Sequence, residues 1–70
     1  MTRHETRTEY CLTVDHSYNG ESDHYYPTLA QAMDANLRAQ EGGYVKRTWI
    51  HRWTWERRGT AWELVDVAKV

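Results

Sequence analysis

Two Asp-His pairs in the first third of the chain place four side chains that can bind a metal ion close together. Asp15-His16 and Asp23-His24 flank an Asn-Gly dipeptide at residues 19–20, which is typical of a two-residue β-hairpin turn. If the hairpin forms around this turn, His16 and Asp23 are cross-strand partners, and all four side chains lie near its tip. Carboxylates and imidazoles bind borderline metal ions such as Zn²⁺. The spacing matches no compact metal motif, however, so we expect solvated side chains, no metal and no cofactor.

Cys11 is the residue that could act as a nucleophile. A catalytic thiol needs a base within reach and a group that stabilises an oxyanion. Cys11 lies in the middle of an alternating segment, with no glycine-rich loop or helix start beside it in the sequence. His51 can pair with Asp66 in one register of the C-terminal hairpin, but a His–Asp pair without a nucleophile is usually structural. Because phosphate-binding and dinucleotide-binding motifs are also missing, we expect a structural cysteine and a protein that is not an enzyme.

Basic and aromatic residues alternate near the C-terminus, a composition that suits stacking on bases and contact with phosphates. The tryptophans are Trp49, Trp53, Trp55 and Trp62, and the basic residues among them are Lys46, Arg47, Arg52, Arg57 and Arg58. The formal net charge of the chain is −1, whereas phosphate-driven binding usually requires a clearly basic domain. Single-stranded nucleic acid is therefore an alternative partner, not the expected one.

Length and composition restrict the class of protein. Seventy residues form one small domain, 1–70, which is marginally stable without a disulfide, a metal or an oligomer. The single cysteine excludes an intramolecular disulfide and favours a reducing compartment. Residues 1–6 are polar, so we expect a frayed start and no signal-peptide core. No apolar run approaches the roughly 20 residues of a membrane span, so we expect a cytoplasmic protein without membrane contact.

Apolar periodicity and turn signals predict the elements that position these residues. Alternation over residues 8–18 predicts a half-buried strand, and residues 21–26 a short polar return strand. A capping box begins a helix at Thr28, and a Gly-Gly pair at 42–43 ends it. The expected buried stripe of this helix is Leu29, Met33 and Leu37, with Ala32 and Asn36 beside it.

The remaining residues predict a second hairpin, with a long strand over 44–56 and a return strand over 60–67. The expected fold is therefore α+β, with the order ββαββ and a four-stranded antiparallel sheet packed on one helix. The alternative is βαββ, with three strands, if residues 21–26 do not form a strand.

The register of the C-terminal hairpin decides which tryptophans are buried. If Gly59 closes a three-residue loop, Trp49 and Trp53 join the core, and Trp62 lies on the other face beside Arg52. If Gly59 ends a two-residue loop, all four tryptophans share one face. We favour the three-residue loop, because the two-residue loop would require an arginine with positive φ.

Both registers leave large apolar side chains on both faces of this hairpin, whereas one helix can cover only one face. Contiguous exposed apolar patches usually mark interaction sites, and Trp and Arg are enriched at binding hot spots. The expected partner-binding residues are Arg52, Arg57, Arg58, Trp62 and Leu64. We therefore predict a non-enzymatic macromolecular binding protein. A small homodimeric structural or accessory protein is a further alternative.

The strand-to-helix junction at 25–33 and the closing hairpin at 56–65 organise the chain in a way that resembles small phage-encoded proteins, including anti-CRISPR inhibitors. Such inhibitors occlude surfaces of a nucleoprotein effector, often with charged residues that block access of nucleic acid. The resemblance implies an inhibitor from a phage or mobile element that acts in the host cytoplasm on a host protein or nucleoprotein complex, such as a CRISPR effector. The basic-aromatic hairpin or the acidic tip at 15–24 would then be the docking surface.

Overall fold

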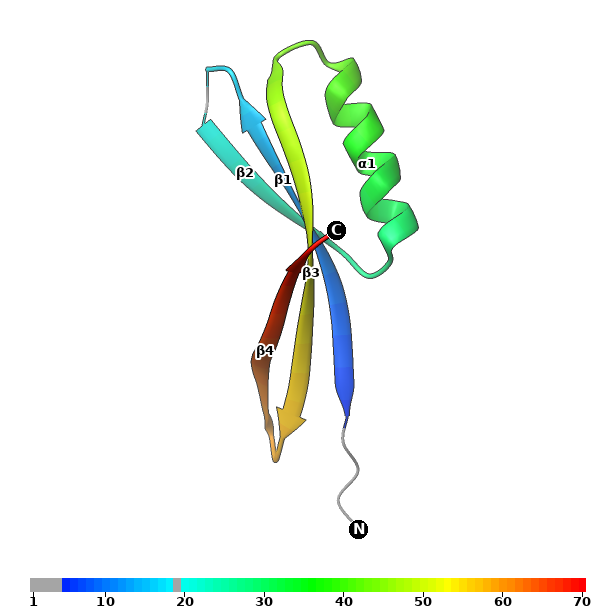
Figure 1. The fold of residues 1–70 in the computed structure, drawn as a ribbon, viewed down its shortest axis with the longest axis vertical. Helices are drawn as coiled ribbons and strands as arrows, with labels where there is room; N and C mark the ends of the chain where they lie inside the picture. The colour runs from blue at the N-terminus through cyan, green and yellow to red at the C-terminus, as the bar shows by residue number, and fades with distance from the viewer. Residues whose placement is uncertain (1–4, 19) are drawn as a thin grey trace.

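The computed structural model describes residues 5–18 and 20–70 of the chain. The elements follow in the order β1 (Thr6–His16), β2 (Gly20–Tyr26), α1 (Leu29–Glu41), β3 (Val45–Arg58) and β4 (Ala61–Lys69). The four strands form one antiparallel sheet in the order β2-β1-β3-β4, with α1 on one face (Figure 1). This is the predicted α+β fold with the order ββαββ. The three-stranded alternative is wrong, because β2 pairs with β1 along its whole length.

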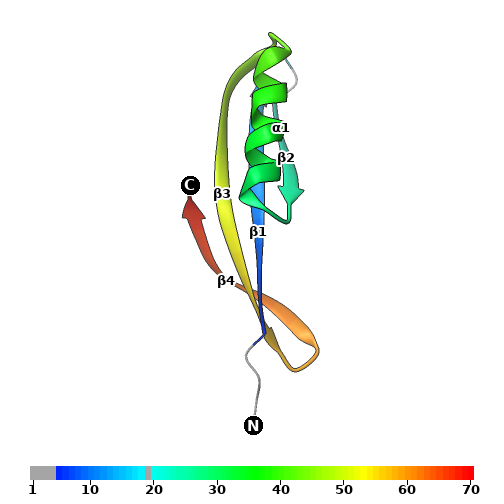
Figure 2. The same ribbon diagram turned by 90° about the vertical axis from the view of Figure 1, so that its right-hand side faces the viewer.

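The molecule is elongated because the two outer strands pair with different halves of the inner strands. β2 pairs with residues 10–16 of β1, whereas β4 pairs with residues 51–58 of β3. The principal-axis extents are 52 × 22 × 17 Å. α1 contacts β1, β2 and β3 but not β4, so it covers only the half of the sheet that contains β2 (Figures 1 and 2). We call the half that contains β4 the open half.

The ends of α1 form as the sequence predicts. The backbone N–H of Gln31 donates to the side-chain oxygen of Thr28 at 3.2 Å, so Thr28 is the N-cap. Gly42 is the C-cap, and Gly43 follows at a φ of 78°, a left-handed conformation that glycine adopts without strain. Among the described residues, no helix is both long enough and apolar enough to cross a membrane.

The helix packs through its alanines, so the predicted buried stripe is wrong in two of its three members. Met33 and Leu37 face solvent with exposed fractions of 54% and 61%, whereas Ala32 is fully buried. Asn36 lies beside Ala32 on the helix and accepts a hydrogen bond from the Thr48 hydroxyl of β3. This contact holds the alanine side of the helix toward the sheet. Apolar periodicity gave most weight to large side chains and therefore predicted the wrong rotation of the helix.

The core lies between α1 and the face of the sheet that α1 covers, which we call the helix face. Its buried residues are Leu12, Val14, Ala32 and Ile50. Side chains alternate along a strand, so the neighbours of Ile50 project from the opposite face. Trp49 and Trp53 both lie on that opposite face, in register with Thr13 and Glu9 of β1. The prediction that these two tryptophans form the core is therefore wrong.

The loop between β3 and β4 differs from both loops that the sequence suggested. Arg58 opposes Ala61, so the loop has two residues, Gly59 and Thr60. Gly59 has a φ of 64°, and no described residue other than glycine has a positive φ. This is the pattern of a hairpin turn with glycine at its first position, which needs no strained arginine.

The observed register places Trp62 on the same face as the other three tryptophans. Between the loop and the bulge of β4 it differs from the preferred register by three residues, which moves the side chains of Trp62 and Leu64 to the other face, whereas beyond the bulge the difference is even and Val67 keeps its face. Trp62 now opposes Arg57, and Leu64 opposes Trp55, whereas Arg52 opposes Ala68. The predicted position of Trp62 on the other face beside Arg52 is therefore wrong.

Two predictions fall partly outside the described residues, namely the frayed segment 1–6 and the turn that includes Asn19. Residues 1–4 and Asn19 are not described. Within the described part, Thr6 already belongs to β1, and the backbone N–H of Arg57 donates to the carbonyl oxygen of Glu5 at 2.9 Å. Residues 5–6 are therefore paired with β3 and not frayed.

Candidate functional site

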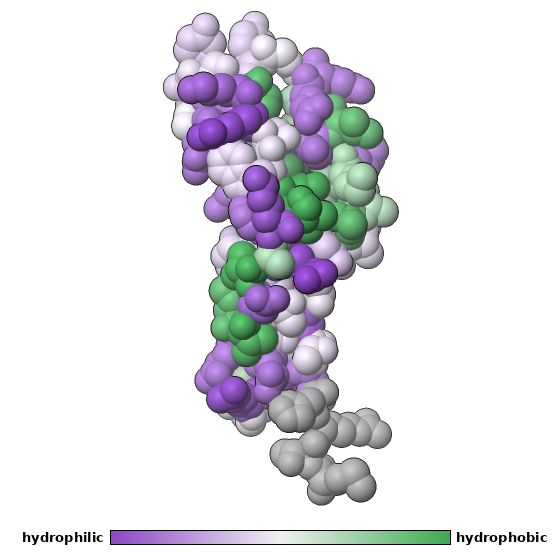
Figure 3. All heavy atoms as spheres, viewed as in Figure 1, coloured by the Kyte–Doolittle hydropathy of each residue, from purple (hydrophilic) through white to green (hydrophobic). Residues whose placement is uncertain are grey.

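The face of the sheet opposite α1, which we call the helix-free face, is the candidate functional site. No described element of the chain covers it. Its large apolar side chains are Tyr25, Trp49, Trp53, Trp55, Trp62, Leu64 and Val67. Most of them lie in the open half, and hydrophobic side chains also gather visibly over β4 (Figure 3). The sequence suggested an exposed apolar patch near β4, and the structure extends it across all four strands.

The aromatic rings of the helix-free face pack against one another. The Tyr25 ring meets the Trp53 ring edge-on, with centroids 5.6 Å apart and an angle of 85°. Trp53 and Trp55 follow at 6.2 Å, and both are half-buried. Trp62 and Leu64 lie on the edge strand β4 and are 36% and 40% exposed. The face thus has a packed centre on β3 and an accessible border on β4.

In the open half, arginines of the helix-free face are paired with carboxylates. The Arg7 guanidinium lies 5.1 Å from the ring centroid of Trp62 and 3.0 Å from the Glu9 carboxylate. The Arg57 guanidinium lies 3.0 Å from the Glu5 carboxylate. The carboxylates offset these cations, and Arg7 also gains a cation–π contact. The open half therefore presents aromatic surface with little net charge.

The same arrangement recurs in the other half of the face. The Arg47 guanidinium lies 5.3 Å from the ring centroid of Trp49 and 3.4 Å from the Asp15 carboxylate. A nucleic-acid phosphate would have to compete with this carboxylate for the arginine. Phosphate contacts supply most of the affinity of non-specific nucleic-acid binding, so these ion pairs weaken the nucleic-acid alternative.

The structure divides the five predicted contact residues between the two faces of the sheet. Arg57, Trp62 and Leu64 lie together on the helix-free face. Arg52 and Arg58 project from the other face, because alternation along β3 separates them from Arg57. The Arg58 guanidinium there lies within 4 Å of two carboxylates, those of Glu56 at 3.9 Å and Glu63 at 3.4 Å.

Sequence reasoning missed three residues of the site that come from the N-terminal half of the chain. Arg7 and Glu9 of β1 and Tyr25 of β2 lie on the helix-free face among the tryptophans. Alternation along β1 places Glu9 on the face opposite the core. Only the pairing of β1 with β3 brings it beside Trp53, and no local pattern predicts which strands are neighbours.

The expected cluster of four metal-binding side chains does not form. Adjacent residues of a strand point to opposite faces, so the aspartates of the two Asp-His pairs lie on the helix-free face and the histidines on the helix face. His16 opposes Gly20 and not Asp23. The Nε2 atoms of His16 and His24 instead lie 3.0 and 3.1 Å from the hydroxyl oxygen of Ser22. Residues 5–18 and 20–70 contain no group of three or more potential metal ligands.

Cys11 is buried, as expected for a structural cysteine. Its exposed fraction is 2%, and its Sγ lies 4.0 Å from the hydroxyl oxygen of Thr13. His51 opposes Cys11 across β1 and β3, and both line a shallow hollow of about 260 Å³ on the helix-free face. Burial raises the pKa of the Cys11 thiol, which disfavours the nucleophilic thiolate. His51 opposes Lys69 on β4, so the suggested pair with Asp66 does not form.

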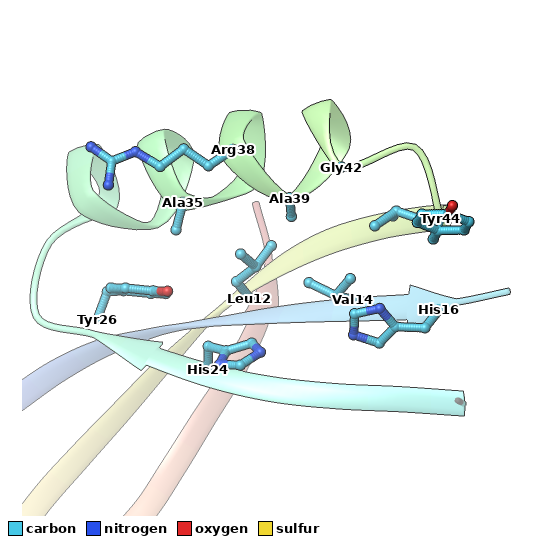
Figure 4. Close-up of a pocket in the computed structure, with 11 residues that line it drawn as sticks. Leu12, Val14, His16, His24, Tyr26, Ala35, Arg38, Ala39, Gly42 and Tyr44 are labelled. Carbon is cyan, nitrogen blue, oxygen red and sulfur yellow. The ribbon is translucent and has the colours of Figure 1, made fainter. Parts of the chain in front are cut away.

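A second concave feature, the groove between α1 and β2, has a volume of about 370 Å³. The imidazoles of His16 and His24 lie side by side along it, whereas the Arg38 side chain extends along the outside of the helix (Figure 4). The Arg38 guanidinium lies 2.9 Å from the Asp34 carboxylate on the same helix. Arg38 is the only arginine or lysine among the described residues that line the groove, and it is turned away from the interior, so the groove is a weaker candidate than the helix-free face.

The fold and the site define a small α+β domain with a packed aromatic face opposite its helix. Comparisons of the chain with protein-family models, with curated proteins and with solved structures found no match. Function is therefore inferred from the helix-free face itself.

Proposed function

We propose that the protein is a non-enzymatic binding module that docks on a macromolecular partner through the open half of its helix-free face. The observation that supports this proposal most strongly is the uncovered aromatic surface of this half. An antiparallel sheet with one apolar face normally packs that face against another layer. Among the described residues, α1 is the only second layer, and it lies on the other side of the sheet.

The opposite side of the open half has the composition of a surface exposed to water. Its side chains on β3 and β4 are Arg52, Thr54, Glu56, Arg58, Ala61, Glu63, Asp66 and Ala68. A sheet that is polar on one side and aromatic on the other has a single side suited to burial. The partner is therefore expected on the helix-free face.

The residues proposed to contact the partner are the accessible ones on and beside β4. Trp62, Leu64 and Val67 are 36%, 40% and 47% exposed. Arg7 and Arg57 lie next to them on the same face. Trp and Arg surrounded by apolar surface form typical binding hot spots. Arg52 and Arg58, on the other side of the sheet, would meet only a partner that extends around the edge of β4.

A protein surface is the favoured partner, because carboxylates already neutralise the arginines of this face. The narrower role is that of an inhibitor from a phage or mobile element, acting on a host protein or a nucleoprotein complex such as a CRISPR effector. The support for this narrower role is the organisation of the chain, which resembles that of small phage-encoded inhibitors. Under this proposal the inhibitor would dock on a protein component of such a complex and not on its nucleic acid.

A photo-crosslinking amino acid at Leu64 tests the proposal, with the same amino acid at Leu37 as the matched control. Both leucines are exposed, but Leu64 lies on the helix-free face and Leu37 on the outer side of α1. In extracts of cells that produce the protein, we expect a discrete crosslinked product from position 64 and none from position 37. Products from position 37 alone, or from neither position, would contradict the proposal.

A further inference from the structure

We propose that the partner of the helix-free face is a second copy of this chain, so that two sheets stack face to face with their helices outside. This inference rests on the proposed function, because it assigns an occupant to the same surface. A symmetric dimer uses one patch twice, so a chain with a single apolar face can form a closed pair. Stacked sheets normally pack about 10 Å apart, with side chains from both faces interdigitated.

The small core of the single chain is the first argument for a second copy. The described part contains five buried hydrophobic residues, namely Cys11, Leu12, Val14, Ala32 and Ile50. Ten other large hydrophobic residues are exposed. Domains of this size without a disulfide often depend on association for stability. An identical chain is present wherever the protein is made, so it can always supply the missing layer.

The size of the face is the second argument. The 22 Å extent runs through α1 and the sheet, so the helix-free face spans the 52 and 17 Å extents, which enclose a footprint of roughly 900 Å² (Figures 1 and 2). A stable interface of standard size buries about 800 Å² on each partner. Such an interface takes up nearly the whole footprint, and α1 does not obstruct it because the helix lies on the other side of the sheet (Figures 1 and 2).

The distribution of charge is the third argument, and it selects the orientation of the two copies. In the half of the helix-free face that lies directly behind α1 and contains β2, three carboxylates accompany one guanidinium: Asp15, Glu21, Asp23 and Arg47. In the open half, three cations accompany two carboxylates: Arg7, Arg57, Lys69, Glu5 and Glu9. The first half therefore has a net charge of −2 and the open half a net charge of only +1, and antiparallel stacking places the acidic half of each copy on the slightly positive half of the other. A parallel arrangement would place like charges together.

Light scattering of the purified full chain over a concentration series tests this proposal, with Leu64→Lys as the disrupting variant and Leu37→Lys as the control. We expect wild type and Leu37→Lys to reach twice the chain mass of 8.4 kDa. Leu64→Lys should raise the dissociation constant by about 100-fold or more, because the symmetric interface would bury the unpaired charge twice.

A second measurement keeps the proposal testable if Leu64→Lys does not fold. A dimer that stabilises its own chains melts at a higher temperature as the wild-type concentration rises. A wild-type mass of one chain and a constant melting temperature would overturn the second-copy proposal, while the crosslink from Leu64 would still test the proposed function. If Leu37→Lys disrupts the dimer and Leu64→Lys does not, the interface lies on α1, and this result also overturns the second-copy proposal.

Discussion

We expect Leu12→Ala to lower the free energy of unfolding by about 2–5 kcal/mol, as for other truncations of buried leucine. Leu12 is 1% exposed and is the only large side chain in the described part that is fully buried. It lies opposite Ile50 in the strand pairing and packs in the same cluster as Ala32 of the helix. The substitution leaves a cavity between helix and sheet, where the small core offers few side chains to fill it.

Leu37→Ala is the matched control for this prediction. Leu37 lies on α1 but is 61% exposed, so its truncation should change stability by no more than about 0.5 kcal/mol. Urea denaturation followed by far-ultraviolet circular dichroism measures both variants. Equal losses in the two variants would contradict the observed rotation of the helix, which buries its alanines and exposes Leu37.

The second large effect is expected for Trp53→Ala, which should cost about 2–3 kcal/mol of stability. Trp53 is half-buried on a central strand, meets Tyr25 edge-on at 5.6 Å and opposes Val67 of β4. Its loss removes the ring that connects β2, β3 and β4 across the helix-free face. The expected cost is below that of a fully buried tryptophan, because part of the ring is already exposed to solvent.

Trp62→Ala is the comparison for Trp53→Ala on the same face. Trp62 lies on the edge strand and is 36% exposed, so its removal should cost about 1 kcal/mol, including the cation–π contact with Arg7. Urea titrations at one low protein concentration keep self-association from contributing. A larger loss for Trp62→Ala than for Trp53→Ala would show that the border of the face, and not its centre, holds the open half together.

The order of the elements could be predicted because each has a local signal. Alternation places Leu12 and Val14 on the core side of β1, Thr28 caps the helix, and the glycine pair ends it. These signals depend on the periods of strand and helix and on the preferences of capping residues, which act over a few neighbouring residues. They do not depend on which strands become neighbours in the sheet.

The register of β3 and β4 could not be predicted from turn chemistry alone. A glycine between polar residues fits a two-residue or a three-residue loop, and the structure places Gly59 first in a two-residue loop with Thr60. A β-bulge between the partners of Thr54 and Trp55 shifts the register again. A register shift by an odd number of residues moves the side chains of a strand to the other face of the sheet. An error in the position of the loop therefore placed Trp62 on the wrong face.

The candidate site could be predicted only in part for the same reason. An exposed patch with Trp62, Leu64 and Arg57 follows from the excess of large apolar residues near the C-terminus. The pairing of Arg7 with Glu9, and the contact of Arg7 with Trp62, depend on the position of β1 beside β3. These contacts turn a basic aromatic hairpin into a nearly neutral surface, which weakens the nucleic-acid alternative further.

Tryptophan fluorescence is the sharpest test of the helix-free face, because all four tryptophans of the chain lie on it. If a second copy covers this face, the emission maximum moves to shorter wavelength as the protein concentration rises. Over the same range of protein concentration, quenching of the tryptophans by acrylamide decreases and light scattering shows that the mass doubles. A mass that doubles while emission and quenching stay constant would place the interface elsewhere and contradict a binding role for this face in self-association.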